Sequence, residues 1–140
     1  MGSWRPRRSE RGAVAVEFAL IFPVVFAVMF GIIQYGIYFW GRSTAAASAR
    51  ESARQMAVGT QWTCSHDRAV AKTGTAASGA VVTMRYVNAT NSVKIGDLVE
   101  VTVTARSVAP NILPLPDDGA ITEVARARVE NIPTTALDCS

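Results

Sequence analysis

One uncharged apolar run near the N-terminus limits what this chain can fold into. Residues 18–41 contain no acidic or basic side chain. As a helix this run would be roughly 36 Å long, against about 30 Å for the hydrocarbon core of a bilayer. In a chain of 140 residues, the run is too large a share to serve as the core of a small soluble domain. It therefore predicts one tilted transmembrane helix.

The charges on either side of the run indicate its orientation. The first twelve residues hold four arginines and one glutamate, whereas residues 42–140 hold ten basic and nine acidic residues. Cytoplasmic flanks of membrane helices are enriched in Lys and Arg. We therefore expect a cytoplasmic N-terminus and an outer domain on the other side. We interpret the basic excess of the chain mostly as a signal for membrane orientation, and therefore expect no nucleic-acid partner.

The helix is expected to continue beyond the membrane, because residues 42–58 are rich in strong helix formers. Alanines recur there at three- and four-residue spacings, namely Ala46, Ala49, Ala53 and Ala57. Gly59 is a suitable C-terminal cap. We predict one long helix over residues 13–59, with residues 18–41 in the membrane.

After this helix the hydrophobic period changes. A link carrying Cys64 and a weak short helix over residues 67–77 come first. Residues 80–87, 97–108 and 120–130 then alternate apolar and polar side chains, as strands do. Three strands with one apolar face need a cover. We therefore expect an α+β fold in which a three-stranded antiparallel sheet packs on the outer half of the long helix.

A glycine and a carboxylate mark the start of the apolar run. Glu17 stands five residues after Gly12. If the chain carried a secretory signal cleaved near residues 45–49, its apolar core would be far longer than the usual length of about 7–15 residues, and this interpretation gives no reason for Glu17. A permanent signal anchor tolerates Glu17 as an interfacial carboxylate. Cleavage after Gly12 would leave an ammonium on Ala13, which a carboxylate from a neighbouring subunit could neutralise in an apolar stack of helices.

The stretch RGAVAVEFALIFPVVF, followed by an alanine-rich segment and an AAREGAR-like signature at residues 48–54, resembles the TadE-like pseudopilins. Ser52 stands where that family usually has glycine. The resemblance extends over residues 11–130 and is strongest over residues 11–59. It implies a pilin-like fold in which residues 60–140 form a small α+β periplasmic domain.

The function that this resemblance implies is that of a minor pilin of the Flp (tight adherence, Tad) pilus system, required for assembly or initiation of pili in adhesion. Its processing site would comprise Gly12, Ala13, Glu17 and Phe18, with residues 1–12 as a cytoplasmic leader. The implied partners are a prepilin peptidase, other pilins or pseudopilins, the inner-membrane assembly platform and membrane lipid. The implied location is the inner membrane, with a single crossing, or the extracellular pilus.

Small residues recur along the apolar run and predict a helix-packing face. This small-residue row consists of Ala15, Ala19, Ala27 and Gly31, interrupted by Pro23. We expect Pro23 to kink or loosen the helix.

Polar and aromatic residues follow at the outer end of the run. Tyr35, Tyr38 and Trp40 are expected at the headgroups. Gln34 could bond a partner helix or lie near the interface, and the proline loop of residues 112–116 could contact a partner or cover the core edge.

The two cysteines, Cys64 and Cys139, both lie in the outer part. In an oxidising compartment they could pair, which would add roughly 4 kcal/mol of stability in the chain-entropy model. The alternative is two buried or free thiols. His66 lies near Cys64, but the further ligands of a metal site are missing nearby.

Catalytic side chains at motif spacing and a glycine-rich phosphate loop are both missing, so we expect neither an enzyme nor a cofactor. The alternative function is a permanently signal-anchored, single-pass periplasmic binding or sensing module. That alternative has no use for cleavage at Gly12.

Overall fold

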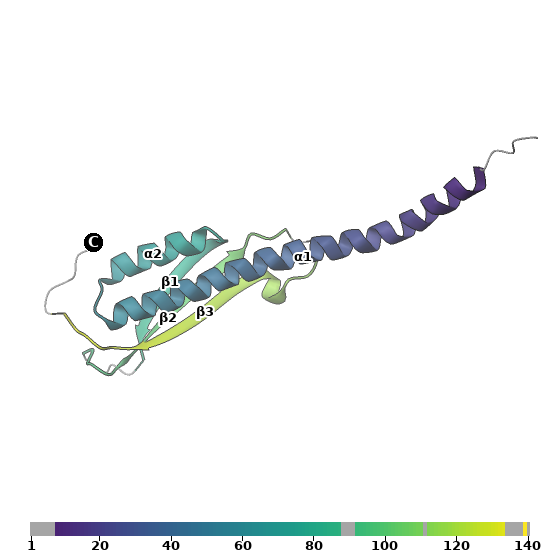
Figure 1. Cartoon of the computed structure of the whole chain (residues 1–140). Coiled ribbons are helices and arrows are strands. Elements are labelled where there is room, and N and C mark those ends of the chain that lie inside the picture. Colours follow the sequence, from purple (N-terminus) through teal and green to yellow (C-terminus); the bar gives the residue numbers. More distant parts are fainter. Residues whose placement is uncertain (1–7, 88–91, 111, 134–138, 140) are drawn as a thin grey trace, which may run out of the picture.

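The computed structural model describes residues 8–87, 92–110, 112–133 and 139, with side chains from Gly12 onward. One long helix extends far beyond a small domain made of a second helix and a sheet (Figure 1). The elements in chain order are α1 (Arg8–Ala57), α2 (Trp62–Gly74), β1 (Ala77–Tyr86), β2 (Leu98–Ser107), the 3-10 helix η1 (Pro116–Gly119) and β3 (Ala120–Arg128). The predicted α+β class is confirmed.

Helix α1 is 50 residues long and has two halves with different surroundings. All side chains of residues 12–29 are exposed, whereas the second half packs against the domain. Among the described residues, α1 is the one helix long and apolar enough to cross a membrane. It ends at Ala57, and two residues later Gly59 has a left-handed φ of 91°, with Thr60 N–H donating to the Gln55 carbonyl.

The sheet has the order β1-β2-β3, and both pairs are antiparallel. Val103 of β2 stands opposite Val82 of β1, and Val101 stands opposite Ala125 of β3. Because side chains alternate between the faces of a strand, the buried residues Val99, Val101 and Val103 share one face. Helices α1 and α2 lie side by side on that face, and no described helix covers the other (Figure 1).

The core forms where α1 crosses β2 and β3. Ala45, Ala49 and Ala53 are buried against the valine face of β2. Gly41 begins this contact, since a Cβ there would lie 3.0 Å from the Ala76 carbonyl oxygen and 3.1 Å from Ile121 Cδ1. Small side chains therefore let the backbone of α1 approach the sheet closely.

The second helix begins earlier than the sequence indicated. We predicted a link followed by a helix over residues 67–77, but α2 begins at Trp62 and ends at Gly74, so Cys64 lies in its first turn. Burial of Cys64, Ala69 and Thr73 against α1 and the sheet stabilises this helix. Tertiary packing thus extended a segment whose own helix propensity is weak.

A carboxylate on the open face of the sheet joins all three strands. Glu100 of β2 accepts hydrogen bonds from Arg85 of β1 and Arg126 of β3. Its side chain is almost fully covered, while both arginines remain mostly exposed. The hydrogen bonds from Arg85 and Arg126 lower the pKa of Glu100 below its usual value.

This network predicts a loss of stability in acid. A carboxyl whose pKa is lowered by folding contributes stability that is fully present above its unfolded pKa of about 4.3 and is lost as the pH falls through the folded pKa. We expect Glu100→Gln to lower the melting temperature of the full chain in detergent micelles at neutral pH. The difference from the wild type should shrink as the pH falls below about 4.

The matched control for that variant is Glu130→Gln. The Glu130 side chain is exposed and makes no ion pair with the residues that the structure describes. Its melting temperature should follow the wild type at every pH. An equal effect of the two substitutions would contradict a specific role for Glu100.

Candidate functional site

The residues of the expected processing site lie on the exposed N-terminal part of α1. Gly12, Ala13, Glu17 and Phe18 all have exposed side chains or backbone. Helix α1 begins at Arg8, so Gly12 lies within the helix. A glycine inside a helix costs about 1 kcal/mol relative to alanine. A Cβ at Gly12 would meet no atom within 4 Å, so packing in this chain does not require glycine there.

Glu17 also has no role in the packing of the domain. Among the residues whose side chains the structure describes, none donates a hydrogen bond to it or forms an ion pair with it. It is the one carboxylate among residues 12–50 of α1. Gly12 and Glu17 thus lie on one bare segment of α1, residues 12–29, and neither has a partner among the side chains that the structure describes.

The small-residue row divides into two parts. Ala15 and Ala19 are exposed, and α1 continues as a helix through Pro23. Farther along, the proline loop approaches α1, and a Cβ at Gly31 would lie 3.3 Å from Leu113 Cδ1. The outer end of the row is therefore used within this chain.

Four phenylalanines form a second row that the sequence analysis missed. Phe18, Phe22, Phe26 and Phe30 lie one helical turn apart, with ring centroids separated by 5.5, 5.5 and 4.3 Å in order. Their four-residue spacing was the signal that could have revealed the row.

An apolar groove lies between this helix and the proline loop. Its lining is formed by Phe22, Pro23, Phe26, Ala27, Phe30, Ile112 and Leu113. Among the described residues, no charged or polar side chain contributes to this lining. Above the groove, the loop is held to α1 by hydrogen bonds.

Gln34 makes a reciprocal pair of hydrogen bonds with one residue of the loop. Its Nε2 donates to the Leu113 carbonyl, and its Oε1 accepts from the Leu113 N–H at 2.9 Å. The hydroxyl of Tyr35 donates to the Pro114 carbonyl at 2.7 Å. Gln34 is completely buried. The sequence left open a bond to a partner helix or a place near the interface, but the structure shows Gln34 bonded to a loop of its own chain.

This contact also changes the interpretation of the aromatic residues near the end of the run. We expected Tyr35, Tyr38 and Trp40 at the headgroups, but Tyr38 is only 2% exposed and belongs to the core of the domain. Trp40 remains exposed. The difference arises because the domain covers one face of α1 from about Phe30 onward, which the pattern of a single helix does not reveal.

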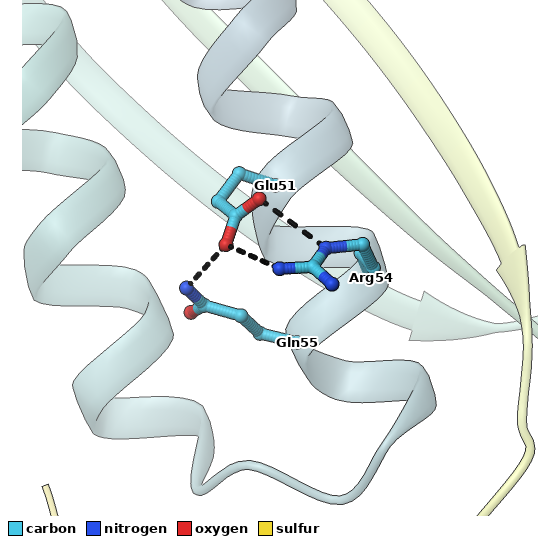
Figure 2. A network of polar contacts seen from close by, with 3 residues as sticks. All are labelled: Glu51, Arg54 and Gln55. Carbon is cyan, nitrogen blue, oxygen red and sulfur yellow. Dashed lines mark hydrogen bonds and ion pairs between the residues drawn. The ribbon is translucent and has the colours of Figure 1, made fainter. Parts of the chain in front are cut away.

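The signature at residues 48–54 lies where α1 faces α2. Ser48 and Ser52 are buried there, so a small residue is needed at position 52, which Ser satisfies as well as the glycine usual at that position. At the exposed edge, Glu51 accepts hydrogen bonds from Arg54 at 3.4 Å and from Gln55 at 2.9 Å (Figure 2). These bonds lower the pKa of Glu51, with that from Arg54 the larger cause.

The two cysteines meet at the far end of the domain. Cys64 in α2 and Cys139 are joined in a disulfide, with their Cα atoms 5.5 Å apart. This bond occupies the thiol nearest His66, whose Nδ1 lies 3.0 Å from Asp67 Oδ1. Within the described ranges, no three His, Cys, Asp or Glu side chains are grouped so that they could hold a metal ion.

The hydrogen bonds of Gln34 predict the effect of removing its amide. Gln34→Met keeps the length of the side chain but leaves the Leu113 N–H and carbonyl unpaired, at a cost of roughly 1–3 kcal/mol for each group that stays buried. Hydrogen exchange measured by mass spectrometry should then show faster exchange of the Leu113 amide in the full chain.

Tyr35→Phe is the control, because it removes a single bond to a carbonyl and spares the Leu113 N–H. We expect a cost of about 1 kcal/mol and little change at that amide. Unchanged protection of Leu113 in Gln34→Met would show that Gln34 does not hold the loop.

Comparison with known proteins adds one match. The family described as TadE-like protein matches residues 12–54. No curated protein and no solved structure matches the chain. The matched segment contains Gly12, Glu17, the groove side of α1 and the part of α1 that packs on the sheet. By this match, residues 12–54, which lie within α1, are similar to the TadE-like family.

Proposed function

We propose that this protein is a minor pilin, a TadE-like pseudopilin that a prepilin peptidase cleaves after Gly12 and that takes part in assembly or initiation of Flp/Tad pili. The observation that carries the proposal is the bare segment of α1. Among the side chains that the structure describes, from Gly12 onward, none is a partner of Gly12 or Glu17, although a helical glycine and a carboxylate beside an apolar run both cost stability. Residues with such a cost and no internal role serve an interaction outside the chain.

Cleavage after Gly12 links these two residues chemically. It would remove the arginines of residues 1–12, which hold the helix in the membrane in one orientation. It would also leave a new ammonium on Ala13. In a stack of apolar helices, Glu17 of an adjacent subunit could pair with that ammonium and set the axial register between subunits. The exposed side chains of residues 12–29 supply the surface that such a stack would bury.

The arrangement of the rest of the chain follows from this assignment. Residues 1–12 are the leader, residues 13–59 the long helix with its membrane part at about 18–41, and residues 60–140 the outer domain. The N-terminus faces the cytoplasm and the domain lies in the periplasm until assembly. A disulfide between Cys64 and Cys139 suits an oxidising compartment.

The partners are those of an assembling pilus subunit. They are the prepilin peptidase, other pilins or pseudopilins, the inner-membrane assembly platform and membrane lipid. A domain of this size beyond the helix favours a minor or initiating role over that of a bulk fibre subunit. The protein is the substrate of the peptidase and has a structural role of its own.

The first test is removal of the leader. In a host that contains its own prepilin peptidase, the membrane-extracted wild type should begin at Ala13 by intact mass and N-terminal sequencing. Gly12→Val should retain the leader, because a peptidase cutting after glycine has a subsite too small for a branched side chain. Gly36→Val is the matched control, since Gly36 is also an exposed helical glycine without neighbours within 4 Å. It should be cleaved like the wild type.

A wild type that begins at Met1 in this host would overturn the proposal. The permanently signal-anchored binding or sensing module would then be the better explanation of the chain.

The second test separates processing from assembly. Glu17→Gln should lose its leader normally but fail to enter the pilus fraction sheared from cells, because each subunit would leave an ammonium unpaired at a cost of about 3–5 kcal/mol. Glu130→Gln is the control and should assemble normally. Recovery of Glu17→Gln in sheared pili at the wild-type level would exclude the proposed pairing.

A further inference from the structure

We propose that residues 112–114 of the proline loop lie within the outer leaflet of the membrane before assembly, and that phospholipid acyl chains fill the apolar groove beside them. This inference rests on the proposed function, which makes α1 a membrane helix with the domain outside. It goes beyond that function by assigning a lipid-contacting surface to the domain itself.

The position of the loop along α1 is the first argument. The loop contacts α1 between Gly31 and Tyr35. These residues lie roughly 21–27 Å along the helix from Glu17, within the hydrocarbon thickness of about 30 Å. Arg42, the first charged residue beyond the apolar run, lies about 10 Å farther out. A helix tilted from the membrane normal would bring the loop deeper still.

The second argument is the satisfaction of the loop backbone. Irregular backbone is tolerated at membrane depth only where its polar groups have partners in the protein. The Ile112 N–H donates to the Pro110 carbonyl, and both backbone groups of Leu113 bond Gln34. Pro114 has no N–H, and its carbonyl accepts from Tyr35. Both N–H groups of residues 112–114 and the carbonyls of Leu113 and Pro114 therefore have partners in the protein, as contact with lipid requires of irregular backbone.

The third argument is the exposure of apolar side chains on the loop and on the part of α1 beside it. Ile112 is 56% exposed on the loop, at the rim of the groove. On the faces of α1 that the domain leaves open, Ile32, Ile33 and Phe39 are exposed as well. We call these exposed apolar side chains, which lie both on the loop and on the open faces of α1, the apolar band, and its surface continues into the bare helix. A partner helix would need one apolar face, whereas lipid contacts every side.

Charged groups begin just outside this band. Arg42 forms an ion pair with Glu123 of β3 at 2.6 Å. This pair belongs to the part of the domain that remains in water, and it places a limit on how deeply the domain can sink.

The experiment measures the depth of Ile112 in a bilayer. Single cysteine variants of the full chain, with the native disulfide kept oxidised, are labelled with an environment-sensitive fluorophore. They are reconstituted in vesicles of phosphatidylcholine and phosphatidylglycerol, and quenching by doxyl-labelled phospholipids is recorded. Ile112→Cys is compared with Val25→Cys on the bare helix and with Val124→Cys on the open face of the sheet, both at exposed positions.

We expect the label at Ile112 to lose fluorescence to doxyl lipids and to shift to shorter wavelength, as the label at Val25 does, while the label at Val124 does neither. A label at Ile112 that behaves like that at Val124 would overturn the inference, because the domain would stand clear of the bilayer. A blue shift at Ile112 that needs high protein density and is not quenched by lipid would also overturn it, in favour of a second copy in the groove. If the label at Val25 were unquenched too, the proposed membrane insertion itself would have failed.

Discussion

The rest of this structure depends on the contact between the buried alanines near the C-terminal end of α1 and the valine face of β2. The apolar face of a three-stranded sheet must be buried against another element. Ala45, Ala49 and Ala53 bring the helix backbone close to Val101 and Val103 and bury the apolar face of the sheet. Since burial of apolar surface is the main favourable term in folding, the domain exists only as an addition to this helix.

This contact makes the bare segment and the domain one continuous body. Helix α1 has no break between residues 12–29, all exposed, and the buried alanines near its C-terminal end. The two halves are therefore joined through one continuous helix, in which Pro23 has no N–H to donate to the hydrogen-bond ladder. The bonds of Gln34 and Tyr35 to the proline loop reinforce the junction where the domain begins.

The periodic parts of the sequence predicted the fold well. Alternation predicted three strands, and β2 and β3 begin and end within two residues of the predicted runs, while β1 begins three residues earlier. The prediction failed where a residue's surroundings come from elsewhere in the chain. Tyr38 looked like a membrane-interface residue and is a core residue, and Trp62 looked like part of a link and begins α2.

The sequence by itself determined the long apolar helix, the change from helical to strand period, and the five-residue spacing from Gly12 to Glu17. Each of these is a pattern within a few turns of one segment. Only the tertiary structure decided what covers Gln34, how the outer end of the small-residue row is used and how the loop lies on α1. Gln34 and Leu113 are 79 residues apart. A local sequence pattern does not predict a contact between residues so far apart in the chain, because that contact depends on how the sheet docks on the helix.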